Sequence, residues 1–247
     1  RRVGTMATGR TVPPMVNQRQ GLLPSGVGAE LSVQCFRDVR TRNVMRIVSV
    51  VVIAGVLLTA PGPGARAEDF KVSEPPAKLK LDPFYKKYVS ASGYPIVSSE
   101  RVSDYALKEA AYLVNLMLSR RPDVRKAMIE SGSRLIVMAH NEFTTDIPEY
   151  AHMKPKDFWD ARARGLGGSR TDPVCSCAEE NVLGLRGDPY STECIVIHEF
   201  AHNIHLRGLV RIDKTFDERL KQAYQRAMER GLWKNKYAST NHAEYWA

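Results

Sequence analysis

The stretch His198-Glu199-Phe200-Ala201-His202 constrains this chain more than any other part of its sequence. Two histidines four positions apart on a helix lie on one face, one turn apart, so both imidazoles can reach the same ion. The glutamate between them projects beside that ion, where it can take a proton from a water. The residues from Cys194 to Leu206 are mostly apolar, which predicts a buried helix. Because buried histidine and glutamate are costly unless they are paired or metal-bound, the stretch predicts a zinc site.

A catalytic zinc has three protein ligands and one open position, so a third ligand is needed. His205 shares the helix face of His198, but a straight helix places it about 10 Å further along the axis. We therefore expect His205 to make a core or supporting hydrogen bond instead. Glu244 is the better candidate, because Thr240 can cap a new helix that carries Glu244 in its second turn, beside two aromatic residues. A buried carboxylate there needs a counter-charge, and the alternative is an ordinary exposed glutamate.

The two stretches together resemble a known family. The His198–His202 motif, followed further along by Tyr237-Ala-Ser-Thr-Asn-His-Ala-Glu-Tyr-Trp-Ala247, is similar to the metalloprotease domain of anthrax lethal factor and its relatives. Those relatives include the secreted Pro-Pro endopeptidases. The resemblance covers roughly residues 190–247. It implies a gluzincin, in which two histidines and a downstream glutamate hold zinc.

Carried over position by position, the resemblance assigns roles to five residues. His198, His202 and Glu244 are the expected zinc ligands, and Glu199 is the expected general base. Tyr237 matches the family's tyrosine, which donates a hydrogen bond near the scissile carbonyl. The family also continues its last helix with a further acidic residue, whereas this sequence ends inside that helix, so we expect a fragment of a longer protein.

The first 67 residues are interpreted as two segments that precede the folded domain. Residues 1–44 lack an initiating methionine and are rich in Arg, Gly and Pro, which is typical of upstream sequence or a disordered tail. Met45–Ala67 has a basic start, an apolar run of 14 residues and small residues before Glu68, which predicts a cleavable secretory signal peptide. That run spans about 21 Å as a helix, short of the roughly 30 Å bilayer core, so no stable membrane anchor is expected. We expect a secreted protein, either extracellular or periplasmic.

Charge and cysteine content narrow the possible classes of function. The chain has 36 Lys+Arg and 27 Asp+Glu, of which residues 1–67 hold nine and two. Residues 68–247 are therefore nearly balanced, at +2, and give no argument for nucleic-acid binding. They contain Cys175, Cys177 and Cys194, and a disulfide from one of the first two to Cys194 is an open alternative.

Hydrophobic periodicity predicts a helix-rich α+β domain over residues 68–247, with a small sheet and the His-Glu motif on an active-site helix. This length is enough for one domain with its own core, and the family resemblance implies a zincin-like fold. The expected elements are an extended arm over 68–99, helices over 103–120, 122–132, 155–164 and 213–230, a buried strand over 134–139, loops over 141–148 and 165–173, and a second strand within 174–185.

The expected function is a secreted zinc-dependent endopeptidase acting on a peptide or protein substrate. A zinc-activated water would attack the scissile bond, with Glu199 as general base and Tyr237 stabilising the oxyanion. Each histidine ligand has a second ring nitrogen that faces away from the metal. The candidates to accept a hydrogen bond from these nitrogens are Glu180, Asp217 and Glu218.

Two alternatives stay open at this point. One is an exported, non-catalytic module whose zinc is closed by a fourth ligand, and the other is a zinc hydrolase of a non-peptide amide. The histidines that could close such a structural site are His140, His152, His205 and His242.

Overall fold

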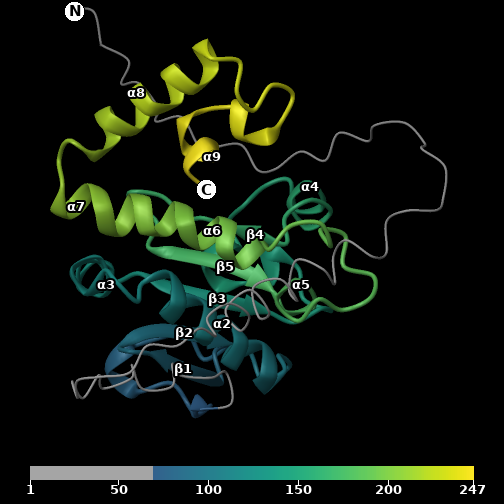
Figure 1. Ribbon diagram of the computed structural model, residues 1–247. Coiled ribbons are helices and arrows are strands. Elements are labelled where there is room, and N and C mark those ends of the chain that lie inside the picture. The colour runs from purple at the N-terminus through teal and green to yellow at the C-terminus, as the bar shows by residue number, and fades with distance from the viewer. Residues whose placement is uncertain (1–68) are drawn as a thin grey trace, which may run out of the picture.

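The computed structural model describes residues 69–247, so the upstream segment and signal peptide predicted over 1–67 lie outside the described residues. The described chain is an α+β fold built on one mixed sheet (Figure 1), which confirms the predicted class. The strands are β1 (Lys87–Ala91), β2 (Tyr94–Ser98), β3 (Arg134–Met138), β4 (Gly165–Leu166) and β5 (Val174–Ala178). The α-helices are α2 (Asp104–Met117), α3 (Pro122–Glu130), α4 (Lys156–Asp160), α5 (Glu179–Val182), α6 (Ile195–Asn203), α7 (Val210–Ile212), α8 (Phe216–Glu229) and α9 (His242–Trp246). The shorter turns are the 3-10 segments η2 (Ala77–Leu79), η3 (Thr144–Asp146), η4 (Pro148–Tyr150) and η6 (Tyr237–Ser239), and the π-helical segment η5 (Ile204–Leu209).

The sheet has five strands in the order β1-β2-β3-β5-β4. The three inner strands β2, β3 and β5 are parallel, and β1 and β4 run antiparallel to their neighbours at the two edges. Helices α2 and α3 connect β2 to β3, and the segment through α4 and β4 connects β3 to β5. Because β4 is an edge strand next to β5, it lies close to α6, which packs on β5.

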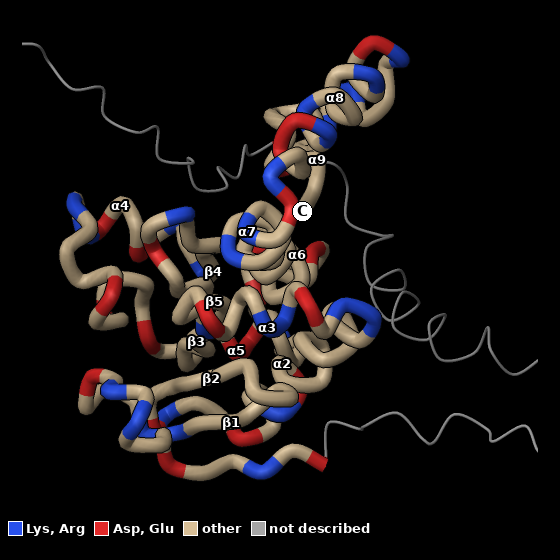
Figure 2. Tube along the Cα trace, turned by 90° about the vertical axis from the view of Figure 1, so that its left-hand side faces the viewer, with Lys and Arg blue, Asp and Glu red and all other residues tan. Residues whose placement is uncertain are grey.

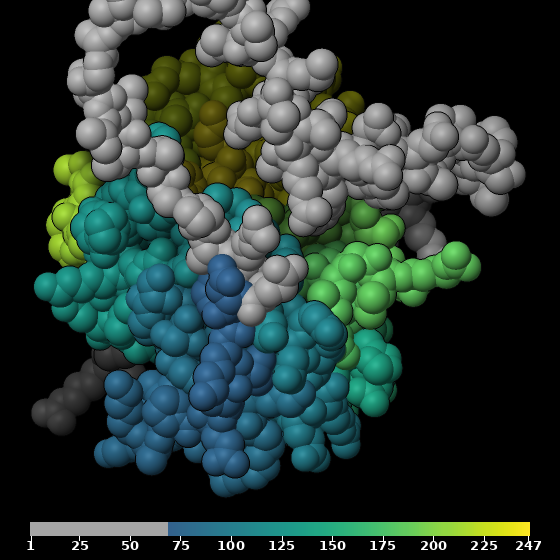
Figure 3. All heavy atoms as spheres, turned by 60° about the horizontal axis from the view of Figure 1, so that its bottom comes forward, coloured from purple at the N-terminus to yellow at the C-terminus, as the bar shows by residue number. Residues whose placement is uncertain are grey.

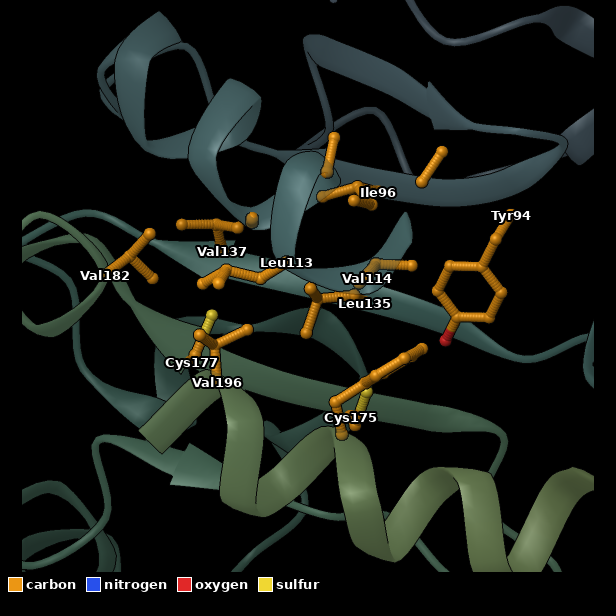
Figure 4. Packing of buried hydrophobic residues seen from close by; sticks show 14 of the residues in the cluster. Tyr94, Ile96, Leu113, Val114, Leu135, Val137, Cys175, Cys177, Val182 and Val196 are labelled. Carbon is orange, nitrogen blue, oxygen red and sulfur yellow. The ribbon is translucent and has the colours of Figure 1, made fainter. Parts of the chain in front are cut away.

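The side chains of β3 alternate between two apolar clusters, one on each face of the sheet. Leu135 and Val137 belong to the cluster that includes α2, α3 and α6, whereas Ile136 and Met138 belong to the cluster on the other face. A strand buried on both faces has a continuous apolar sequence, and the buried strand predicted over 134–139 is confirmed as β3. Figure 4 shows the first cluster filling the space between α2 and α6.

The predicted starts of α2 and α3 and the predicted ends of α3 and α8 are confirmed. Ser103 caps α2, and its side chain accepts a hydrogen bond from the backbone N–H of Tyr105. Helix α3 begins at Pro122 and is followed by Gly132 with a φ of 76°. Helix α8 is followed in the same way by Gly231, with a φ of 68°.

The extended arm predicted over 68–99 is wrong in its second half, which forms the β1–β2 hairpin. Ser92 and Gly93 make the two-residue turn, with φ of 52° and 91°, as a type I′ turn requires. The paired residues Val89 and Ile96 are fully buried. Proline and lysine in this stretch suggested an arm, but the turn and the burial of one face override that composition.

Two smaller predictions about residues 155–173 differ from the structure. The loop predicted over 165–173 contains β4, which is too short to produce a periodic pattern. The helix predicted over 155–164 is only one turn, α4. The strand predicted within 174–185 is confirmed as β5, which ends at Ala178 and passes directly into α5.

Cys175, Cys177 and Cys194 are free thiols in the structure, so the alternative of a disulfide to Cys194 is not formed. Within residues 69–247, no helix combines the length and the apolar character that crossing a membrane requires. Basic and acidic residues are interspersed over the described chain, including α8 (Figure 2), in line with the balanced charge of this part.

The C-terminal helices lie at one end of the molecule. Figure 1 shows α8 and α9 above α6, on the side away from β1 and β2. In Figure 3 the end built from the β1–β2 hairpin comes forward and the C-terminal residues lie behind it. Helix α6 is therefore placed between the sheet and the C-terminal helices, and contacts both.

Candidate metal centre

Helix α6 carries the His-Glu motif and is buried on nearly all sides, as predicted. Among its residues Ile197 is the exception, with 39% of its surface exposed. Its first backbone N–H, from Ile195, donates to Oδ1 of Asn181 in α5 at 2.7 Å. The Nδ2 group of Asn181 donates in turn to the carbonyl of Glu193 at 2.9 Å. One buried amide thus fixes both the start of α6 and the turn that leads into it.

Helix α9 brings Glu244 to the other side of the site. Its cap is Asn241, whose side chain accepts hydrogen bonds from the N–H groups of Ala243 at 2.8 Å and Glu244 at 3.0 Å. The prediction that Thr240 is the cap was therefore wrong by one residue, and Glu244 lies in the first turn. Trp246 Nε1 donates to the carbonyl of Ala201 at 2.7 Å, which fastens α9 directly to α6.

The three predicted ligands converge on one point. His198 Nε2 lies 3.1 Å from His202 Nε2, and Glu244 Oε2 lies 3.2 and 3.3 Å from these two nitrogens. All three residues are buried, and they are the group of potential ligands that residues 69–247 bring together. Zinc with bonds of about 2.0–2.1 Å to a tetrahedral ligand set separates its ligand atoms by about 3.3 Å, so the triangle fits zinc closely. Glu244 Oε2 also accepts no hydrogen bond although it is buried, as expected of an atom that faces a cation.

The electrostatics of the triad favour a cation at its centre. His198 Nδ1 lies 3.1 Å from Glu193 Oε1, so that N–H can donate to Glu193 and leave the Nε2 lone pair facing the triad. Burial lowers the pKa of His198, but the carboxylates of Glu193 and Glu244 outweigh burial and raise it. Burial raises the pKa of Glu244, but the two imidazoles outweigh that effect and hold it below its usual value.

Glu199 is a buried carboxyl group with a raised pKa. It is 8% exposed, and burial raises its pKa to about 7, with His198 and His202 acting in the opposite direction. A carboxyl group whose pKa lies near neutral pH can both accept and release a proton there. A hollow of about 10 Å³, the room of roughly one water, lies beside it and is lined also by Gly165 and Tyr190.

Tyr237 lies beside His198 and is partly exposed. Its ring centroid is 6.2 Å from that of His198, and 38% of its surface is exposed. Burial of the hydroxyl and the carboxylates of Glu244 and Glu199 raise its pKa. The hydroxyl therefore stays protonated and can donate a hydrogen bond.

The remaining candidates from the sequence lie elsewhere. His205 Nε2 contacts Asp217 Oδ1 at 2.6 Å, which confirms that His205 makes a core hydrogen bond. Glu180 pairs with Arg164, and Glu218 accepts from a side-chain amide on its own helix. None of the three carboxylates proposed to hold the ligands does so; Glu193 holds His198 instead.

Sequence reasoning missed Glu193, Asn181 and Asn241. Asn241 was detectable, because asparagine is a preferred cap and it stands three positions before Glu244. Glu193 and Asn181 carry no local signal, because their contacts depend on the turn between α5 and α6. A wider groove of about 510 Å³, lined by residues 74–77, 80–83, 85–86 and 100, contains none of the candidate site residues.

No protein-family model, no curated protein and no solved structure matches this chain. The structure brings His198, His202 and Glu244 together as a candidate metal site on an α+β fold.

Proposed function

We propose that this chain is a zinc-dependent endopeptidase of the gluzincin type. The observation that carries the proposal is the convergence of two separate sequence motifs, on α6 and α9, into one buried His-His-Glu triad with zinc-like spacing. A buried glutamate with a pKa near 7 follows His198 directly in the sequence. A site that only binds a structural ion has no need of such a base, so Glu199 favours an enzyme.

His198, His202 and Glu244 would hold the zinc. When bound, zinc supplies Lewis acidity, which polarises a scissile carbonyl and makes a water more acidic. Glu199 takes the proton of the attacking water and passes it to the leaving amine. Tyr237 donates a hydrogen bond to the oxygen on which negative charge develops.

The alternative of a closed, structural zinc site is less well supported. Of the four extra histidines, His140 is bound to Glu179 and His205 to Asp217. Within residues 69–247, the potential ligand group contains three members, which leaves a position for water. Secretion through the Met45–Ala67 segment remains part of the proposal and rests on the sequence pattern alone.

The test is the substitution Glu199→Gln, measured by metal content and by cleavage of a peptide library. Zinc should stay bound at the level of the unmodified protein, whereas hydrolysis should fall by at least the roughly 10²- to 10⁴-fold that a general base contributes. Glu218→Gln, on the exposed side of α8, is the matched control and should change neither quantity. Full activity in Glu199→Gln would refute the mechanism. A wild-type protein that binds zinc but cleaves no peptide would favour the binding module or the non-peptide hydrolase.

A further inference from the structure

The backbone that follows β4 runs unusually close to one of the ligands. Leu166 packs against the cluster on the far face of the sheet, whereas its neighbours Gly165 and Gly167 face α6. A Cβ atom placed on Gly167 would lie 2.5 Å from Cβ of His202 and 3.0 Å from both Cγ and Cδ2 of the same ring. The three nearest atoms therefore all belong to His202.

This crowding cannot be relieved by turning a side chain. The position of His202 Cβ is fixed by the backbone of α6, so a change of rotamer leaves the 2.5 Å contact in place. The backbone of Gly167 is also held to the helix, because its carbonyl accepts a hydrogen bond from Asn203 Nδ2 at 3.3 Å. Asn203 is completely buried and bonded on its other side to Ser133. A side chain at position 167 must therefore push α6 and β4 apart.

We propose that Gly167 is a positioning residue for His202. Because glycine has no side chain, the backbone at position 167 lies directly against the His202 imidazole. The ring is thereby held between Gly167 and the other two residues of the triad, His198 and Glu244. Ligands must be held to within about 0.5 Å for a metal site to keep its affinity, so a displacement of His202 should weaken metal binding. The inference rests on the metal-binding part of the proposed function and does not depend on peptide hydrolysis.

Gly208 supplies a matched control on the same helical run. A Cβ atom there would lie 2.6 Å from Cγ1 of Val124 and 3.0 Å from Cγ of Met128, both on α3. The crowding is similar to that at Gly167, but it falls on α3 and on no ligand. Gly208→Ala therefore reports the general cost of an added methyl group near this helix.

The experiment measures zinc affinity by competition with a chelator, together with the melting temperature of the zinc-free protein, for the full chain and its variants. Gly167→Ala should raise the dissociation constant for zinc roughly 10- to 100-fold, the range found for residues that support metal ligands. Gly208→Ala should lower the melting temperature of the zinc-free protein and leave zinc affinity unchanged. Equal zinc affinity in Gly167→Ala and the wild type would overturn the inference, as would an equal loss of affinity in Gly208→Ala.

If Gly167→Ala does not fold, Asn203→Ala carries the test, because it releases the Gly167 carbonyl without adding an atom. Zinc affinity should then fall relative to the wild type, and unchanged affinity in a folded Asn203→Ala protein would overturn the inference. A wild-type protein that binds no zinc would instead refute the proposed function itself. The two failures are thereby distinguished.

Discussion

Glu193 is the residue whose contact best explains how His198 presents the correct nitrogen to the triad. Its carboxylate lies 3.1 Å from Nδ1, on the opposite side of the ring from the ligand atom. Partners of this kind fix the tautomer and orientation of a ligand, and their loss typically weakens metal affinity about 10- to 100-fold. We expect this loss in Glu193→Ala, measured by chelator competition, and a smaller loss in Glu193→Gln, which can still accept the hydrogen bond.

The control for Glu193 is Glu218→Gln, because the sequence offered Glu218 as a partner of the ligands and the structure pairs it with an amide on its own helix instead. Its zinc affinity should equal that of the wild type. If Glu193→Ala binds zinc as tightly as the wild type, the contact between Glu193 and His198 has no role in metal binding.

Tyr237 should affect turnover rather than metal binding. Loss of one donor to a developing oxyanion costs roughly 10²- to 10³-fold in kcat, so Tyr237→Phe should show this fall with zinc content and KM nearly unchanged. Tyr245→Phe is the matched control, because Tyr245 packs on Tyr224 at 5.8 Å between ring centroids. A fall in zinc content instead of kcat would assign Tyr237 a structural role.

The sequence predicts those parts of the site whose residues are close together in the chain. His198, Glu199 and His202 share one helical turn, so four-residue periodicity is enough to place them together. Glu244 needed a second motif and the family resemblance, because only tertiary packing brings α9 onto α6. Glu193 precedes His198 by five residues through a turn, and no periodicity relates the two side chains.

At the level of elements, α9 is short and depends on its cap. A five-residue helix has no intrinsic stability in water, so it is held by Asn241 at its start and by the Trp246 hydrogen bond to α6. Asn241→Ala removes two hydrogen bonds and should lower the free energy of unfolding by about 1 kcal/mol, within the 0.5–2 kcal/mol range for caps. Because α9 carries Glu244, zinc affinity should fall as well.

Thr240→Ala provides the comparison for this prediction, since threonine is also a common cap but the structure gives Thr240 no capping bond. Urea denaturation should show nearly wild-type stability for Thr240→Ala and reduced stability for Asn241→Ala. The opposite order would place the cap at Thr240, as the sequence first suggested.

Elements with long periodic patterns were predicted well, and short ones were not. Helices α2, α3 and α8 have caps or stop residues at their ends, and β3 is a continuous apolar run, so each is determined by its own sequence. Strand β2 is completed by pairing with β3, which is distant in the chain, and the two-residue β4 exists only through its pairing with β5. A strand of two residues such as β4 is too short to show a periodic pattern that predicts its pairing.

At the scale of the whole molecule, hydrogen bonds to the carboxylate of Glu179 connect α5 to the start of α2 and to the end of β3. Its Oε2 accepts from the N–H of Ser103 at 2.7 Å, at the start of α2, and its Oε1 accepts from the N–H of His140 at 2.9 Å, after β3. Glu179 itself begins α5 and is 4% exposed. Burial alone would raise its pKa, but the hydrogen bonds from Ser103 and His140 outweigh burial and hold the pKa below its usual value.

The lowered pKa of Glu179 predicts that its contribution to the free energy of unfolding decreases in acid. A group whose pKa is lower in the folded protein stabilises the fold fully above its unfolded pKa, about 4.3 for glutamate. Its contribution is lost as the pH falls through the lower, folded value. At pH 7, Glu179→Gln should reduce the free energy of unfolding by roughly 1–3 kcal/mol, because a buried N–H then faces an amide that cannot accept every bond.

The free energy of unfolding is measured by urea denaturation at a series of pH values. Its difference between Glu179→Gln and the wild type should stay constant above about pH 5 and shrink below about pH 4. Glu130→Gln is the control, because Glu130 is an exposed residue of α3 paired with Lys126 only at 3.8 Å, and it should remain close to the wild type at every pH. A difference that persists unchanged in acid would mean that the shape of the side chain stabilises the fold and its charge does not. The three joined elements pack against the same apolar core as α6. Loss of this carboxylate should therefore destabilise the core that supports α6 and its two histidine ligands.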